Sequence, residues 1–249
     1  MSGAALITGS NGGIGRALCR AFADAGYRVI GLDRAGGPVA PDSGVSVTIT
    51  CDVRVFATDT PARADMLRAL RKEIGDGGLG VLVNNAAVQL LQTADEVTAA
   101  ALHETLDTNL IAPLMLVQGL LGELERGRGS VINIGSVHGT ATKPGFVSYA
   151  TSKAALAGLT RALAVDLGGR VRVNTISPGS ISTPMLEAGF EGQPEARRQL
   201  DSVHPLGRVG TAAEVAAVAV FLASAAASNI TALDLRVDGG VSARLHDPA

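Results

Sequence analysis

The sequence predicts an α/β fold: a single-domain, Rossmann-like, doubly wound parallel sheet of about seven strands with helices on both faces. Short apolar runs alternate with longer helical patterns along the whole chain, which is typical of a parallel sheet built from β–α units. The composition is 47% apolar but only 3% aromatic, as is common where helices pack closely on such a sheet. No linker or repeat is visible, so we expect residues 1–249 to form one domain.

The apolar runs and helical patterns locate each element. We expect strands at Ala4–Thr8, Arg28–Leu32, Ser46–Thr50, Gly80–Asn84, Ser130–Ile134, Arg170–Ile176 and Leu233–Val237, and helices at Ile14–Ala25, Pro61–Ile74, Glu96–Glu125, Ser148–Leu167 and Ala212–Ala223. The connection "DRAGGPVAPDSGV" is rich in Gly and Pro and predicts a short loop where this fold ordinarily has a helix. The segment from 179 to 210 is long for a connection, and we expect a substrate loop or lid at about 183–210, with one or two mobile helices.

Charge and cysteine content exclude several classes of protein. The net charge is −2 with scattered acids and bases, so no basic stripe indicates nucleic acid or a membrane surface as a partner. Cys19 and Cys51 lack the spacing of metal ligands and are interpreted as small core residues, and no metal is expected. The start "MSGAALITGS" lacks the features of a signal peptide, and polar residues interrupt the uncharged stretch Val215–Leu233. We therefore expect a cytoplasmic protein.

The stretch "TGSNGGIG", residues 8–15, lies between the first predicted strand and the first predicted helix. A helix N-terminus presents free N–H groups and a partial positive charge, which suits a diphosphate. Gly9 permits a tight turn, and Gly13 and Gly15 allow the backbone to approach a ligand and the helix to approach the sheet. The glycines alone fit a plain turn equally well.

Two acidic residues at strand ends favour a dinucleotide site. Asp33 closes the second predicted strand, where a carboxylate can bind the adenosine ribose hydroxyls. That carboxylate would repel a 2′-phosphate and so favours NAD over NADP, although the adjacent Arg34 could bind the phosphate. Asp52 ends the third strand and is placed to meet the adenine edge. Each acid alone could be a strand-end cap, but the three features together at one sheet edge indicate a dinucleotide cradle.

Tyr149 and Lys153 are one turn apart in "SYATSKAALAGLTRALAVDL" and share a helix face. A phenol with an ordinary pKa near 10 is a poor acid–base catalyst at neutral pH. An ammonium group nearby favours phenolate and lowers that pKa, which would make Tyr149 usable as a proton donor and acceptor. An isolated pair of this kind is more often an ordinary surface pair, so its interpretation depends on context.

The chain resembles the short-chain dehydrogenase/reductase family along nearly its whole length. The matching motifs occur in family order: "TGSNGGIG" at 8–15, "DV" at 52–53, "NNAA" at 84–87, Asn109 in "LDTNL", "INIGS" at 132–136, "YATSK" at 149–153, "PGSISTP" at 178–184 and "VDGG" at 237–240. Two motifs depart from the family pattern, with Ala87 and Ala232 where the family usually has Gly. Neither departure affects the expected catalytic set.

The resemblance implies four catalytic residues. Tyr149 would exchange a proton with the substrate oxygen, and Ser136 would hydrogen-bond the same oxygen. Lys153 would bind the nicotinamide ribose and lower the pKa of Tyr149, and Asn109 would hold a water that links Lys153 to solvent. The expected cofactor is NAD. The residues expected to bind it are Gly9, Asn11, Gly12, Gly13, Ile14, Gly15, Asp33, Arg34, Asp52, Val53, Asn85, Tyr149, Lys153, Pro178, Gly179, Ile181 and Thr183.

The same resemblance suggests which residues meet the substrate but leaves its identity open. Candidates are Gln89, His138, Phe146 and Met185, with Val88 and Leu186 nearby. Gln89 and His138 are similar to carboxylate-binding positions of the 3-hydroxybutyrate dehydrogenase branch, but that branch has Lys where this chain has Phe146. A hydroxy acid, a polyol, a sugar and a cyclic alcohol are all compatible with these residues.

Two other functions are compatible with this fold. A 3-oxoacyl carrier-protein reductase would normally have a basic residue in the glycine loop for NADP, where this chain has Asn11 and Gly12. A non-catalytic NAD-sensing module would generally have lost Tyr149 or Lys153. The resemblance also implies a homotetramer, with the helices predicted at Glu96–Glu125 and Ser148–Leu167 at one interface.

Overall fold

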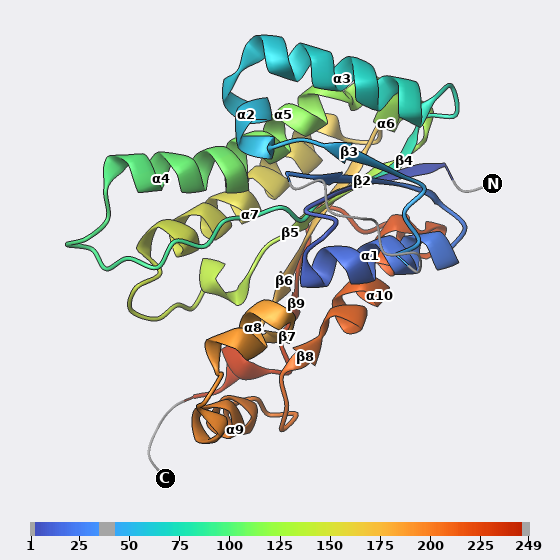
Figure 1. Ribbon diagram of the computed structural model, residues 1–249. Helices are drawn as coiled ribbons and strands as arrows, with labels where there is room; N and C mark the ends of the chain where they lie inside the picture. The colour runs from blue at the N-terminus through green and yellow to red at the C-terminus, as the bar shows by residue number, and fades with distance from the viewer. Residues whose placement is uncertain (1–2, 35–42, 246–249) are drawn as a thin grey trace.

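Figure 1 shows the computed structural model, which describes residues 3–34 and 43–245. A parallel sheet of seven strands forms its centre, in the order β3-β2-β1-β4-β5-β6-β9. The strands are β1 Ala4–Thr8, β2 Arg28–Asp33, β3 Val47–Thr50, β4 Leu79–Asn84, β5 Ser130–Ile134, β6 Arg172–Pro178 and β9 Asp234–Val237. The predicted doubly wound α/β fold is confirmed. The loop predicted between β2 and β3 falls mainly on residues 35–42, which lie outside the described residues.

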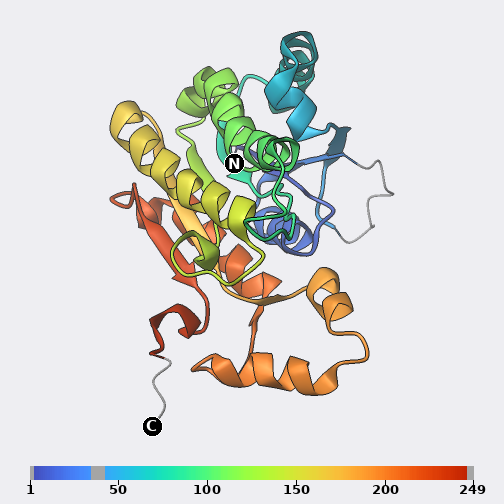
Figure 2. The same cartoon turned by 90° about the vertical axis from the view of Figure 1, so that its left-hand side faces the viewer.

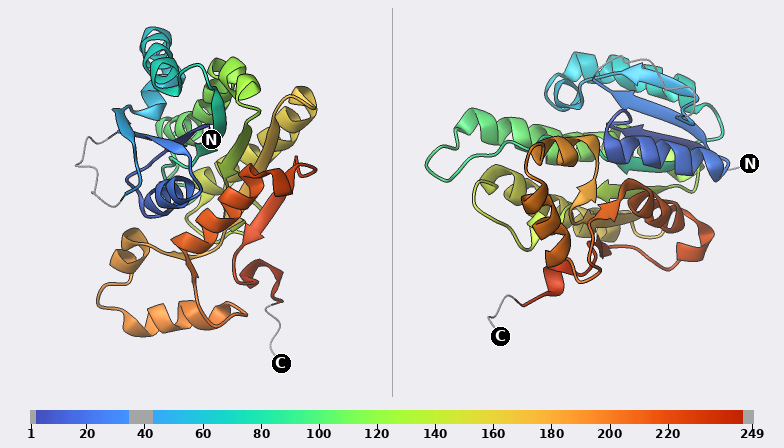
Figure 3. Two further views of the ribbon diagram at one scale, coloured as in Figure 1. Left: turned by 90° about the vertical axis from the view of Figure 1, so that its right-hand side faces the viewer. Right: turned by 60° about the horizontal axis from the view of Figure 1, so that its bottom comes forward.

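Helices cover both faces of the sheet (Figure 3). α1 (Gly13–Asp24) and α10 (Ala212–Ala223) pack on one face, and α2 (Val53–Thr58), α3 (Thr60–Ile74) and α7 (Val147–Leu167) lie on the other. Because strand side chains alternate, Val81 and Ile132 join the core beneath α1 and α10, whereas Leu82 and Val131 join the core beneath α7. Burial on both faces explains why the strands are continuous apolar runs in the sequence.

The prediction of one continuous helix at Glu96–Glu125 is wrong. The segment contains α4 (Ala99–Leu106), a π-helical turn η1 (Asp107–Ile111), α5 (Ala112–Gly119) and α6 (Leu121–Arg126). Pro113 is the physical reason for the first interruption, because it has no N–H to donate to the carbonyl of Asn109 four residues before it. The turn therefore widens into a π-helical one, a feature frequent at functional sites.

The predicted lid region contains two helices, α8 (Pro184–Gly189) and α9 (Pro194–Val203). Figure 2 shows them standing apart from the layers that enclose the sheet. A small two-stranded sheet of β7 (Ile181–Ser182) and β8 (Gly210–Thr211) joins the two ends of the segment that contains α8 and α9. Short 3-10 turns complete the structure at η2 (Val137–Gly139), η3 (Ala225–Ala227) and η4 (Val241–Ala243). In the described part of the chain, no helix is long and apolar enough to cross a membrane.

Candidate active site

The glycine loop after β1 folds back tightly on itself. Gly9 has a φ of +64°, a conformation that L side chains rarely adopt, and a Cβ there would lie 2.9 Å from the Cα of Ala86. A Cβ at Gly15 would lie 2.0 Å from the carbonyl oxygen of Gly9. A Cβ at Gly13 would lie 2.7 Å from Cγ2 of Thr183, at the start of the lid region. Gly9 and Gly15 are thus required by close backbone approaches, and Gly13 by the side chain of Thr183.

The glycine loop is fixed to the end of β4, the strand next to β1. From β1 the chain adds β2 and β3 on one side and β4, β5 and β6 on the other, so the switch point of the sheet lies between β1 and β4. The hydroxyl oxygen of Thr8 accepts hydrogen bonds from the N–H groups of Asn85 and Ala86, both at 2.9 Å. The side-chain amide of Asn85 donates to the carbonyls of Thr8 (2.9 Å) and Gly9 (3.0 Å). In an open α/β sheet, a crevice at such a switch point is where ligands bind.

The two acidic residues at strand ends behave differently. The carboxylate of Asp33 accepts a hydrogen bond from the N–H of Asn11 in the glycine loop, with 2.9 Å between N and Oδ2. Arg34 beside it is exposed. The carboxylate of Asp52 instead caps α2 by accepting from the N–H of Arg54 at 2.8 Å, and Val53 is buried as the first residue of that helix. Of these two acidic residues, Asp33 is therefore the one that is hydrogen-bonded to the glycine loop.

Tyr149 and Lys153 lie on the buried face of α7, next to the end of β5 that leads to Ser136. The Lys153 ammonium donates to the carbonyl oxygen of Ile134 at 2.7 Å and lies 5.6 Å from the centroid of the Tyr149 ring. Lys153 is only 4% exposed, and this burial lowers the pKa of its ammonium to about 8. Its remaining two N–H groups have no protein partner among the described residues.

The pKa of Tyr149 is shifted in the opposite direction to the one expected from the nearby Lys153. Burial raises the pKa of the Tyr149 phenol above its ordinary value, and a hydrogen bond with the Ser136 hydroxyl opposes part of that rise. The structure thus brings Ser136, Tyr149 and Lys153 together, but desolvation outweighs the favourable contacts of the phenolate.

Asn109 lies in the π-helical turn and is 1% exposed. Its Nδ2 donates to the carbonyl of Val88 (2.9 Å) and to the hydroxyl of Ser152 (3.0 Å), and its Oδ1 accepts from the N–H of Val88 (2.9 Å). Both side-chain hydrogens are thereby taken, which leaves one Oδ1 lone pair for a water. Asn109 joins the loop after β4 to α7 one residue before Lys153.

The rings of His138 and Phe146 lie next to Tyr149. The rings of His138 and Phe146 stack with their centroids 4.3 Å apart, and the Tyr149 ring is 6.0 Å from that of His138. The Lys143 ammonium lies 4.9 Å from the centroid of the Phe146 ring. Burial and the Lys143 charge both lower the pKa of His138, which favours a neutral imidazole. By contrast, Gln89 is exposed.

The lid region begins beside the glycine loop. Pro178 ends β6, Gly179 continues the backbone contact with β9, and Ile181 is buried in the small sheet. Thr183 caps α8 by accepting from the N–H of Leu186 at 3.3 Å. The side chain of Met185 lies outside the described part of the structure.

Comparison with known proteins identifies the family to which this geometry belongs. The family model described as "Enoyl-(Acyl carrier protein) reductase" matches residues 8–242. The chain belongs to the short-chain dehydrogenase/reductase family. This family consists of oxidoreductases that use a nicotinamide cofactor.

Relatives and solved structures match over nearly the full chain. L-fucose dehydrogenase of Oryctolagus cuniculus is 39% identical over 94% of this chain and 83% of its own length. Galactitol 2-dehydrogenase (L-tagatose-forming) of Cereibacter sphaeroides is 37% identical over 95% of this chain and 93% of its own. The ligand-free aldohexose dehydrogenase of Thermoplasma acidophilum superposes with a TM-score of 0.90 at 30% identity, covering 100% and 97% of the two chains. A structure from Agrobacterium tumefaciens with bound NADP has a TM-score of 0.84 at 30% identity and covers 97% of each chain.

The residues at the carboxyl edge of the sheet fit the family's nicotinamide dinucleotide. α1 begins at the glycine loop with no side-chain cap on its first N–H groups among the described residues, so these groups suit a diphosphate. Asp33 lies at the end of β2, and the buried Lys153 has two N–H groups without protein partners among the described residues. The diphosphate, the adenosine ribose and the nicotinamide ribose would each meet a matching group along this edge.

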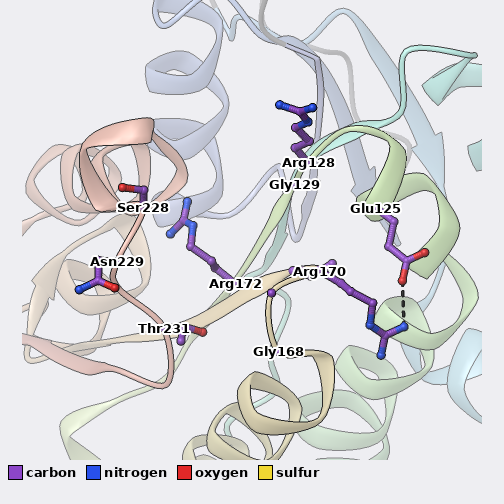
Figure 4. Close-up of a pocket in the computed structure, with 11 residues that line it drawn as sticks. Glu125, Arg128, Gly129, Gly168, Arg170, Arg172, Ser228, Asn229 and Thr231 are labelled. Carbon is purple, nitrogen blue, oxygen red and sulfur yellow. Dashed lines mark hydrogen bonds and ion pairs between the residues drawn. The ribbon is translucent and has the colours of Figure 1, made fainter.

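A cavity of about 660 Å³ lies at the opposite edge of the sheet and is not part of this site (Figure 4). Arg128, Arg170 and Arg172 line it, but their guanidinium groups point in different directions. Arg172 donates to carbonyls at the end of α10, including that of Leu222 at 2.8 Å, and Arg170 pairs with Glu125 at 2.9 Å. Arg170 also donates to the carbonyl of Leu167 at the end of α7, at 3.3 Å, so two of these arginines bind the carboxyl ends of helices instead of converging on a ligand.

The sequence interpretation missed several residues that position the site. The Thr8 hydroxyl binds the backbone after β4, and the Ser152 hydroxyl accepts a hydrogen bond from Asn109. Asn133 of β5 and Thr160 of α7 form a buried hydrogen-bonded pair between the strand and the helix. Asn133 does leave a signal in the sequence, because it is a polar residue inside the apolar strand "SVINI".

Proposed function

We propose that this short-chain dehydrogenase/reductase interconverts a secondary alcohol and a ketone with NAD(H), and that its substrate is a sugar or polyol. The observation that carries the proposal is the meeting of Ser136, Tyr149 and Lys153 at the carboxyl edge of the sheet, where the glycine loop also lies. The catalytic unit extends over residues 1–249, with the segment from 183 to 210 as the substrate lid.

The bound cofactor supplies the hydride acceptor for alcohol oxidation. Tyr149 takes the hydroxyl proton of the substrate, and the Ser136 hydroxyl binds the same oxygen as charge develops on it. Lys153 binds the nicotinamide ribose through its free N–H groups and places a positive charge near the phenol ring. Asn109 holds the loop after β4 and helix α7 together through its hydrogen bonds to Val88 and Ser152. Its remaining Oδ1 lone pair would accept a hydrogen bond from a water that carries protons between Lys153 and solvent.

NAD is proposed as the cofactor because of Asp33. Its carboxylate lies beside the glycine loop, where it would bind ribose hydroxyls and repel a 2′-phosphate. Asn11 and Gly12 give the loop no cationic side chain for that phosphate. A similar structure does contain NADP, and Arg34, next to Asp33, is the residue that could bind the additional phosphate.

A neutral polyhydroxylated substrate is favoured over a hydroxy acid. Relatives named for fucose and galactitol are similar over nearly the whole chain. The imidazole of His138 beside Tyr149 is disposed to be neutral, so it suits a hydroxyl better than a carboxylate. Its Nδ1 is 3.0 Å from the hydroxyl of Thr142, which leaves Nε2 for the substrate.

The test is a panel of sugars, polyols, cyclic alcohols and hydroxy acids, each assayed with NAD and with NADP for formation of the reduced cofactor. Turnover of a neutral polyol or sugar with NAD is expected. Turnover of hydroxy acids alone would contradict the substrate assignment. Cofactor binding without turnover of any alcohol would favour the non-catalytic sensing module, and turnover of 3-oxoacyl thioesters with NADPH would favour the carrier-protein reductase.

We also propose a homotetramer. The outer face of α7 exposes Val165 by 80% and Val147 by 40%, an arrangement that would bury apolar surface if two copies met there. Light scattering tests this assembly, and a monomeric mass would contradict it.

A further inference from the structure

A row of polar side chains crosses the sheet beneath α7. Asn84 of β4 is the register partner of Asn133 of β5, which in turn is the partner of Thr175 of β6. The residues two positions earlier, Leu82 and Val131, belong to the apolar core on the α7 side of the sheet. By strand alternation the polar row faces the same side, at its carboxyl edge.

This row is buried and hydrogen-bonded to α7. Asn133 and Thr175 are 0% exposed, and Thr160 of α7 is 1% exposed. The Asn133 amide Nδ2 donates to the Thr160 hydroxyl at 2.8 Å, and the hydroxyl oxygens of Thr160 and Thr175 are 2.7 Å apart. On its other side, Oδ1 of Asn133 accepts from Nδ2 of Asn84 at 2.8 Å.

The Thr160 hydroxyl has its full set of partners. It donates to the carbonyl of Leu156 in its own helix at 2.9 Å, and it accepts from Asn133 and Thr175. One donor and two lone pairs are all that a threonine hydroxyl offers. Losing this hydroxyl would leave the buried amide of Asn133 without an acceptor, which is costly. A hydrogen bond also requires a definite position of its two partners, whereas the apolar contacts of α7 do not.

Thr160 lies on the same helix stripe as the proposed catalytic residues. Tyr149, Lys153 and Thr160 follow the spacing of one face of α7. Lys153 bonds to the carbonyl of Ile134, and Thr160 bonds to the side chain of Asn133, the preceding residue of β5. The helix is therefore attached to neighbouring residues of one strand at two points, two turns apart.

We propose that the Asn133–Thr160 hydrogen bond fixes the register of α7 on the sheet and thereby positions the phenol of Tyr149 against Ser136. Lys153 takes part in the proposed cofactor contacts, so its bond to Ile134 changes surroundings when the cofactor binds. The Asn133–Thr160 pair touches neither cofactor nor substrate and can hold the helix in place throughout turnover. Asn133 and Thr160 are accordingly positioning residues. This inference rests on the proposed function for its kinetic readout.

The test compares three variants of α7. Thr160→Val keeps the shape of the side chain and removes the hydroxyl, Thr160→Ser keeps the hydroxyl, and Leu167→Val removes apolar contact at the far end of the helix. We expect Thr160→Val to lower kcat about 10-fold or more, because small misplacement of a reacting group is costly. We expect Thr160→Ser to restore kcat, and Leu167→Val to lower the melting temperature without changing kcat.

A second readout is independent of turnover. The chain has two tyrosines, so in a Tyr27→Phe background the ultraviolet titration of phenolate reports Tyr149 alone. Because the Ser136 hydroxyl lowers the pKa of Tyr149, a shifted helix should raise that pKa further in Thr160→Val but not in Thr160→Ser. If the wild-type chain shows no turnover, the proposed function fails while this titration still decides the positioning role.

An unchanged kcat and an unchanged Tyr149 titration in Thr160→Val, with only a lower melting temperature, would overturn the proposal. If Thr160→Val does not fold, Thr160→Ala decides, since it removes the same hydroxyl without placing a methyl group against the Asn133 amide. Lower kcat and a raised Tyr149 pKa in Thr160→Ala support the proposal, and a purely thermal effect overturns it.

Discussion

The N–H of Asn11 donates a hydrogen bond to the carboxylate of Asp33, with 2.9 Å between N and Oδ2. This bond ties the glycine loop after β1 to the end of β2, so that the charge of Asp33 is held at the side of the cradle. The position of a carboxylate there is the physical basis of the proposed preference for NAD.

Asp33→Asn should shift the cofactor preference toward NADP. The amide oxygen can still accept from the N–H of Asn11, so the loop is kept while the charge is removed. We expect the ratio of NADP to NAD affinity to rise at least about 10-fold, which corresponds to about 1.4 kcal/mol. Fluorescence titration with NADH and NADPH measures the ratio. Arg34→Leu is the companion variant and should weaken NADPH alone; an unaltered ratio in Asp33→Asn would show that Asp33 does not discriminate.

Ala232→Gly should stabilise the protein. Ala232 has a φ of +62°, a left-handed conformation that disfavours a Cβ. Relief of this strain exceeds the entropy that glycine adds to the unfolded chain, so we expect a gain of about 1 kcal/mol in the free energy of unfolding. Denaturant unfolding measures it. Ala217→Gly, at an exposed position inside helix α10, is the matched control and should lose about 1 kcal/mol. A loss at both positions would contradict the strain at Ala232.

Lys153→Met should change how stability depends on pH. The folded pKa of Lys153 is lowered from 10.5 to about 8, so the unfolded chain binds more protons between these values. Stability contributed by this group therefore rises with pH across that window, and the full cost of the buried ammonium is present below pH 8. Lys153→Met should exceed wild type in stability at pH 7, and the difference should shrink as the pH approaches 10.

Lys72→Met at the exposed end of α3 is the control, and its difference from wild type should not follow the same course. A stability difference in Lys153→Met that is constant from pH 7 to pH 10 would show that the ammonium pays no desolvation cost in the fold.

Alcohol oxidation should accelerate with rising pH. The proposed base is the phenolate of Tyr149, and burial raises the pKa of this phenol, so the reactive form becomes more populated toward alkaline pH. The pH profile of kcat/KM should rise across the alkaline range. Tyr27→Phe should leave that profile unchanged, since Tyr27 packs against Phe22 on the other side of the sheet. A profile that falls with increasing pH would contradict the role of Tyr149 as base.

The sequence was sufficient for the sheet and for the residues that gather at its carboxyl edge. The alternation of apolar runs with helical patterns and the glycine loop are local patterns, and they located Asp33 and Tyr149 at a strand end and near a helix start as the structure has them. The break around Asn109 was harder, because a proline four residues downstream changes the hydrogen bonding of a helix that otherwise has continuous apolar character.

Long-range relations escaped the sequence for a different reason. The raised pKa of Tyr149 depends on how deeply α7 is buried, and the capping role of Asp52 depends on a short helix that its own side chain begins. The Asn133–Thr160 contact joins residues 27 positions apart, so no local pattern contains it. Ala232 was visible as a departure from the family glycine, but its backbone strain required the structure.

Tyr149→Phe tests the central claim most directly. The variant keeps the ring that packs near His138 and Phe146 and removes only the hydroxyl. We predict that NADH binding, measured by fluorescence titration, stays at the wild-type affinity while kcat for alcohol oxidation falls at least about 100-fold. A Tyr149→Phe protein that oxidises its alcohol at the wild-type rate would contradict the account.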